Sequence, residues 1–214
     1  EARIKDLVRQ RFVHAESLRR PKRGQDDDVT RVTLSSGALL VLQPSPAPVV
    51  AARSVCFGGL RWETPAHAGL GNLFSSVWGL ATEALPTDAL AQKIASLGGS
   101  LGAFAGRNTL GMRCDFIAEN ALAGLSVFAD ALVSPVFEAD DISRERAVIL
   151  ERIKNREDNP AGVSFELFAQ AVYPTHPYGL PQAGTLETVA AFTLEDLLAY
   201  RRTYTTSDKL VLTV

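Results

Sequence analysis

Apolar residues along the chain follow first the two-residue period of strands and then the 3.6-residue period of helices. Strand-like runs cover residues 29–34, 38–42 and 49–57, and the turn residues Ser35-Ser36-Gly37 join the first two runs as a hairpin. Helical spacing follows over residues 67–80 and returns after Thr87, which we predict to be the N-cap of a second helix.

The second half of the chain repeats this order. Residues 100–105 and 109–116 form a predicted hairpin around Gly106-Arg107-Asn108. Helices are predicted over residues 122–132, 139–157, 159–172 and 194–204, before a closing strand at 209–214. Grouped strands and helices without βαβ alternation predict an α+β fold, an antiparallel or mixed sheet with helices packed on one face, and not a Rossmann-like sheet.

Composition excludes two classes of partner. The 214 residues are 46% hydrophobic and carry a net charge of -2, which suits a soluble globular protein and gives no general attraction to nucleic acid or anionic membrane. No apolar run reaches the ~18 residues that a spanning helix needs. We therefore expect neither a nucleic-acid partner nor a membrane partner.

The charged N-terminal segment and the two chain ends suggest a piece of a longer polypeptide. Residues 1–28 place a basic stretch at 19–24 before Asp26-Asp27-Asp28, which is typical of a solvated linker or hinge, and residues 29–214 form the predicted domain. The chain lacks an initiator Met and ends in an apolar run. We expect the targeting signal to lie outside this fragment, so the periplasm and the cytoplasm both remain open.

Cysteines and histidines give little support for a metal site. Cys56 and Cys114 lie in apolar, strand-like runs, which favours buried free thiols, with a disulfide as the alternative. His14, His67 and His176 include no pair at i, i+4, so no helix can present two histidines to one metal. We expect His67 to be a surface or capping residue and His176 to anchor a loop rather than to transfer protons.

Several motifs occur in one order over residues 29–214 and together resemble a known family. They are the hairpin 32–42, Gly58-Gly59-Leu60-Arg61-Trp62 before the helix at Gly69, Leu97-Gly98-Gly99-Ser100, Glu145-Arg146-Ala147-Val148, and His176-Pro177-Tyr178-Gly179. This set is similar to the insulinase, pitrilysin and mitochondrial processing peptidase family of zinc metallopeptidases. The resemblance implies the α+β domain of that family.

The zinc motif of the family is missing from this chain. Its HxxEH ligands and general base would fall on Asn72, Ser75 and Ser76, which are an amide and two hydroxyls. The third ligand, about 75 residues further on, would fall on Arg152, whose fixed positive charge repels zinc. Glu151, one residue earlier, would point ~100° away and supply only one ligand. No G-x-S-x-G elbow supports Ser75 or Ser76 as a nucleophile.

The resemblance therefore implies a catalytically inactive domain whose parent protein or complex is a zinc metalloendopeptidase. It implies that this domain forms part of a chamber that encloses peptide substrate opposite an active half, in the same polypeptide or in a partner subunit. No cofactor is expected in this chain, and zinc is expected in the active half. Asn72, Ser75, Ser76 and Arg152 are the candidate chamber-lining residues, with a solvated helix charge as the alternative for Arg152. The alternative function is a structural or assembly subunit of the same fold.

Overall fold

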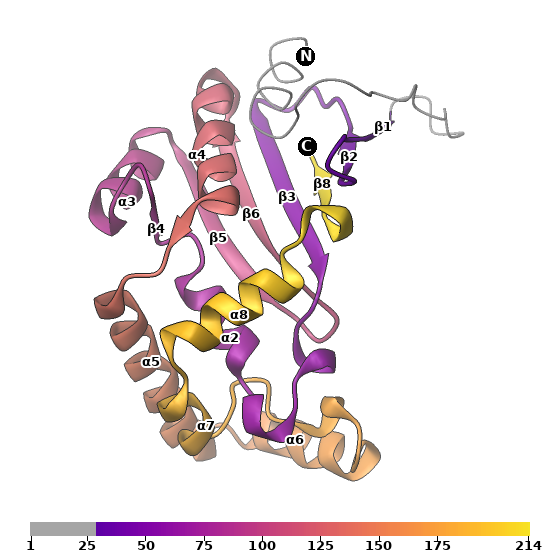
Figure 1. Cartoon of the computed structure of the whole chain (residues 1–214), viewed down its shortest axis with the longest axis vertical. Coiled ribbons are helices and arrows are strands. Elements are labelled where there is room, and N and C mark those ends of the chain that lie inside the picture. The colour runs from indigo at the N-terminus through magenta and orange to yellow at the C-terminus, as the bar shows by residue number, and fades with distance from the viewer. Residues whose placement is uncertain (1–28) are drawn as a thin grey trace.

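A six-stranded mixed sheet is the centre of the fold (Figure 1). The computed structural model describes residues 29–214, apart from the side chains of Glu157 and Asp158, so the predicted linker at 1–28 lies outside the described residues. The strand order is β1-β2-β8-β3-β6-β5, and only the β2–β8 pair is parallel. These strands are β1 (Thr30–Thr33), β2 (Leu39–Leu42), β3 (Val49–Phe57), β5 (Gly99–Ala105), β6 (Thr109–Ile117) and β8 (Val211–Thr213).

Alternation of side chains gives the sheet one buried face. On β6, Leu110, Met112 and Cys114 are buried, whereas Arg113 between them is exposed. Successive side chains of a strand point to opposite faces, so only one face joins the core. The helices α2, α4 and α8 lie over this face in Figure 1, and α3 lies beside the edge strand β5. The predicted α+β class, with helices on one face of a mixed sheet, is therefore confirmed.

Helices surround the sheet on that side and at one end. They are α2 (Leu70–Val77), α3 (Thr87–Ser96), α4 (Ala121–Val133), α5 (Ala139–Lys154), α6 (Pro160–Val172), α7 (Leu186–Ala191) and α8 (Leu194–Tyr204). Figure 1 shows α5, α6 and α7 together at the lower end of the view, beyond the strands. No helix in the described part of the chain combines the length and the apolar character that crossing a bilayer requires.

Most of the predicted elements are present, and the differences have local causes. Thr87 is not the N-cap of α3, because Pro86 holds that position and the Thr87 hydroxyl instead donates to the Asp141 carboxylate. The helix from residue 139 ends at Lys154, and a short 3₁₀ helix follows it. The sequence pattern missed α7 and the two-residue pair β4 (Ala81–Thr82) and β7 (Pro135–Val136), which are too short to show a period.

Both cysteines lie in the core as free thiols, as predicted. They project from neighbouring strands at different levels, since Cys114 is paired with Ala52 and Cys56 with Leu110. Burial raises the pKa of Cys56 to about 11 and that of Cys114 to about 12. The two thiols therefore stay protonated at neutral pH and act as small apolar side chains.

Candidate functional site

A buried glutamate sets the start of α2, the helix on which the family's zinc motif would fall. The residue before the helix, Gly69, has a left-handed backbone (φ 90°) and no side chain with which to cap the helix. Glu63 takes over that role: its carboxylate accepts hydrogen bonds from the backbone N–H groups of Gly69 at 2.8 Å and Gly71 at 2.9 Å. Free N–H groups at a helix start favour a negative partner, so Glu63 fixes where α2 begins.

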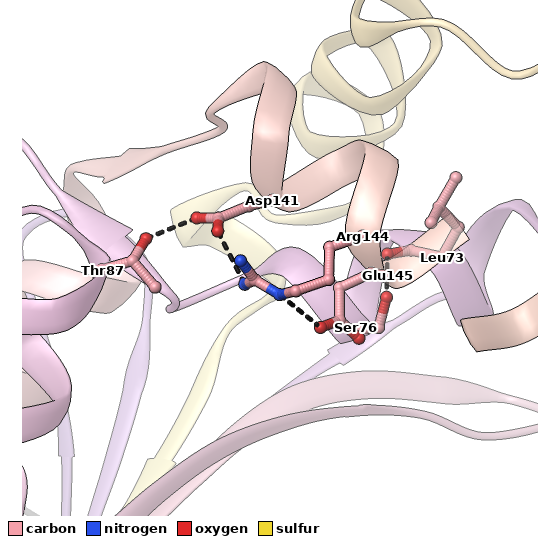
Figure 2. A network of polar contacts seen from close by, with 6 residues as sticks. All are labelled: Leu73, Ser76, Thr87, Asp141, Arg144 and Glu145. Atoms are coloured by element: carbon pink, nitrogen blue, oxygen red, sulfur yellow. Dashed lines mark hydrogen bonds and ion pairs between the residues drawn. The ribbon is translucent and has the colours of Figure 1, made fainter. Parts of the chain in front are cut away.

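Two of the four predicted site residues are engaged within α2 itself. The Ser75 hydroxyl donates to the carbonyl of Asn72 at 3.0 Å, and the Ser76 hydroxyl donates to the carbonyl of Leu73 at 2.9 Å. Figure 2 shows Ser76 turned back toward Leu73. No base accepts the proton of either hydroxyl, which is what a serine nucleophile needs. These two residues do not border the cavity described below.

The other two predicted residues, Asn72 and Arg152, come together at one cavity. The cavity has a volume of about 360 Å³, and its walls come from α2, α5, α6, the β5–β6 turn and residues 178–183. Asn72 is half-buried, and its side-chain nitrogen is buried without a hydrogen-bond partner. Arg152 is exposed at the rim, and no carboxylate among the described residues forms an ion pair with it. Glu145, on the same helix, lies 3.7 Å from Arg144.

The opposite wall of the cavity is a loop held against the β5–β6 turn. The Tyr178 hydroxyl donates to the side-chain oxygen of Asn108, and the Gln182 amide donates to the carbonyl of Ala105 at 2.8 Å. The Arg107 guanidinium lies 5.7 Å from the centre of the Tyr178 ring, within the range of a cation–π contact. Arg107 and Arg152 therefore border the same cavity from two distant parts of the chain.

The residues at the zinc-motif positions do not fit zinc. Asn72 offers a neutral amide, the two serine hydroxyls are bound to carbonyls of their own helix, and Arg152 brings a positive charge. Among the side chains that the structure describes, no three of His, Cys, Asp or Glu lie close enough together to hold a metal ion. His67 is exposed, as expected for a surface residue, and its Nδ1 lies 2.8 Å from the Thr64 hydroxyl; it caps neither neighbouring helix.

A carboxylate network ties α5 to α3 beside this site. Figure 2 shows Asp141 between Thr87 and Arg144, with Arg144 continuing toward Glu145. Asp141 is buried in the first turn of α5, where a negative charge is favoured by the helix dipole, and it bonds to Arg144 at 2.7 Å. Arg144 is about half exposed, so the contribution of this pair to stability is modest.

Sequence reasoning missed three residues of this region. Arg107 was read only as part of a hairpin turn, Tyr178 only as part of a motif, and Glu63 was not singled out. The Gly106-Arg107-Asn108 turn places a charged side chain between two turn formers, which was the available signal for Arg107. His176 does anchor its loop, because its Nδ1 accepts the backbone N–H of Tyr178 at 3.1 Å.

Burial also shifts the pKa values of two groups around α2. Burial raises the pKa of Glu63, and the N–H groups of Gly69 and Gly71 oppose that rise. Burial likewise raises the pKa of Tyr200, whose hydroxyl accepts the backbone N–H of Gly59 at 3.0 Å. Glu63 is committed to helix capping and Tyr200 to the loop before it. Neither group is positioned as a free acid or base.

Comparison with known proteins places this geometry in a family. The model of the family "Insulinase (Peptidase family M16)" matches residues 39–186. A Bacillus subtilis protein named as an uncharacterized zinc protease, YmxG, is 29% identical over 187 residues, which is 87% of this chain and 46% of that protein. A Mycobacterium leprae protein with a similar name is 28% identical over 201 residues, 94% of this chain and 45% of that protein. The chain thus spans about half the length of these relatives.

Solved structures share the fold at low sequence identity. A structure described as a peptidase inactive domain from Pseudomonas fluorescens superposes with a TM-score of 0.81 at 20% identity, covering 86% of this chain and 45% of that one. Pitrilysin superposes with a TM-score of 0.76 at 18% identity, covering 93% of this chain and 22% of that one. With the family model matching most of the domain, the chain belongs to the insulinase family of peptidases.

Proposed function

We propose that this domain is a non-catalytic part of a zinc metallopeptidase and forms a wall of the chamber that encloses peptide substrate. The observation that carries the proposal is the cavity at the former zinc-ligand positions. Asn72 and Arg152 border it, and neither is a zinc ligand. A cavity bordered by an amide and a guanidinium, with no metal ligand among these two residues, suits a surface that contacts peptide without cleaving it.

The active half would supply the zinc chemistry in this proposal. Whether fused or separate, it would carry the HxxEH motif and the downstream glutamate. The length of the relatives supports a second unit, since this chain covers only 46% of the B. subtilis zinc protease. The name of that relative supports zinc in the assembly, and the residues of this domain do not fit the ion.

Peptide binding without hydrolysis is the test of this function. A fluorescent, unstructured peptide is titrated with the protein, its anisotropy is followed, and the same sample is analysed by mass spectrometry after prolonged incubation. We expect saturable binding and an intact peptide. Cleavage that a chelator abolishes would contradict the non-catalytic assignment, and the absence of binding for every unfolded peptide tried would remove the chamber assignment.

A structural or assembly subunit is the second candidate, and an apolar surface on α6 favours it. Four large apolar side chains of this helix are exposed, Phe165, Leu167, Phe168 and Val172. Exposed apolar clusters of this kind mark contact surfaces. If the purified protein binds no peptide yet forms a stable complex with another subunit, and Phe165→Ser with Phe168→Ser abolishes that complex, the assembly function replaces the chamber function.

A further inference from the structure

The cavity beside α2 carries two arginines that form no ion pair with a carboxylate whose side chain the structure describes. Arg152 comes from α5 and Arg107 from the β5–β6 turn, and both border the same space. Neither forms an ion pair with any described residue. The one acidic side chain on the wall, Glu166, is already paired with Arg156 at 2.6 Å. The cavity therefore has an excess of positive charge.

The shape of the cavity suits a small group rather than a whole peptide. Its volume of about 360 Å³ is near the lower end of the range for ligand sites. The Tyr178 hydroxyl and the Gln182 amide nitrogen already donate to the protein, to Asn108 and Ala105. The guanidinium groups of Arg107 and Arg152 are then the strongest donors left for an occupant, and their forked N–H groups match a carboxylate.

Arg107 is held in position more firmly than an ordinary surface arginine. Its guanidinium lies 5.7 Å from the centre of the Tyr178 ring. That ring packs edge-on against His176 at 4.5 Å and against Tyr173 at 5.4 Å. A cation resting on a fixed ring loses less conformational entropy on binding a ligand, so less of the binding energy is spent on ordering it.

We propose that this cavity binds a carboxylate group of a peptide, with Arg107 and Arg152 as its two ligands. Arg152 thus places a fixed positive charge at the border of the cavity, where it attracts an acidic group of the substrate. The carboxylate belongs to the peptide's C-terminus or to an Asp or Glu side chain. This inference rests on the proposed function, because it names the chemical group that the chamber wall recognises.

Four versions of one unstructured, fluorescent peptide test the inference. They combine a free or an amidated C-terminus with a Glu or a Gln at one internal position. The wild-type protein is titrated with each, and R107Q, R152Q and R113Q are titrated in parallel. Arg113 is a matched control, because it is an exposed arginine on the sheet face away from the cavity. Circular dichroism of each variant checks that it is folded.

Removing the recognised carboxylate should weaken binding to the wild type about tenfold, the effect of one charge-assisted contact. R107Q and R152Q should each weaken binding of the acidic peptide about as much, and R113Q should not. In R152Q the effect of removing that carboxylate should shrink, which shows that the two groups are coupled. If amidation weakens binding, the recognised carboxylate is the C-terminus of the peptide. If the change of Glu to Gln weakens binding, it is the side chain.

Two kinds of result would overturn the inference. The first leaves the proposed function intact, and the second overturns it as well. If all four peptides bind the wild type equally, or if R107Q and R152Q bind the peptides like the wild type, the cavity does not recognise a carboxylate. The proposed function of peptide binding would still be supported. If no peptide binds the wild type, both the inference and the chamber function fail.

Discussion

The Oε1 atom of Glu63 accepts the backbone N–H of Gly71 at 2.9 Å, in the first turn of α2. A β-carbon on Gly71 would lie 2.9 Å from the same oxygen and 2.7 Å from the Tyr200 hydroxyl. The loop that carries Glu63, helix α2 and helix α8 therefore meet at one closely packed point. The position of Asn72, the next residue of α2, depends on this contact.

Glu63→Gln should lower the free energy of unfolding by about 1–3 kcal/mol, because the two backbone N–H groups bond to different carboxyl oxygens and Gln replaces one of these acceptors with an NH2 group. Its effect should also depend on pH. Burial raises the pKa of Glu63 from its ordinary value of 4.5, so the folded protein holds this proton more tightly than the unfolded chain. The resulting stability is present at low pH and is lost as the pH rises from 4.5 through the folded-state pKa.

Urea unfolding of both proteins between about pH 4 and about pH 7 checks this sign. The free energy of unfolding of the wild type minus that of Glu63→Gln should fall as the pH rises. The other carboxyl groups contribute equally to both proteins and cancel in this difference. A difference that grows with pH would mean that the N–H groups outweigh burial and that the pKa is lowered.

Gly71→Ala should destabilise the protein by about 1–3 kcal/mol, because the added carbon collides with Glu63 and Tyr200. This loss exceeds the gain of about 0.5–1 kcal/mol that alanine brings to a helix. Gly102→Ala is the control, since a β-carbon there would meet nothing within 4 Å, and its effect should stay within about 1 kcal/mol. Equal unfolding midpoints for the two variants would contradict the packing described around Gly71.

Asn72→Leu should raise the free energy of unfolding by about 1 kcal/mol, because it removes a buried amide nitrogen that has no partner. Asn108→Leu is a matched control, for which we expect a change in the free energy of unfolding of the opposite sign. Asn108 accepts the Tyr178 hydroxyl, so Asn108→Leu should destabilise the protein by up to about 1 kcal/mol. The thermal unfolding midpoints of the two variants and of the wild type test this prediction. A loss of stability in Asn72→Leu would show that the Asn72 amide has a hydrogen-bond partner.

The sequence pattern predicts those elements of the fold that are long enough to show a regular period, or that are joined by a distinctive turn. Strand β3 and helix α8 have the predicted bounds, because nine and eleven residues are long enough to show their periods. The insertion of β8 between β2 and β3 was not predicted, because strand order depends on contacts between residues far apart in the chain. The pair β4–β7 depends on such contacts as well.

The sequence was sufficient to predict that the site lacks zinc ligands, but it was not sufficient to predict which residues border the cavity. The side chains at positions 72, 75, 76 and 152 already rule out zinc ligation. Asn72, Ser75 and Ser76 were all expected to line the chamber, yet only Asn72 borders the cavity, and both serine hydroxyls bond to carbonyls of α2. Arg107 and Arg152 border the same cavity through tertiary packing, which no local pattern encodes.

The central claim is that Asn72, Ser75, Ser76 and Arg152, the residues at the zinc-motif positions, do not form a metal centre. Zinc content decides it most directly: the purified protein is equilibrated with micromolar zinc, dialysed, and measured by inductively coupled plasma mass spectrometry. The account predicts far less than one zinc per chain and the same thermal unfolding midpoint with and without chelator. One tightly held zinc per chain, whose removal lowers that midpoint, would contradict it.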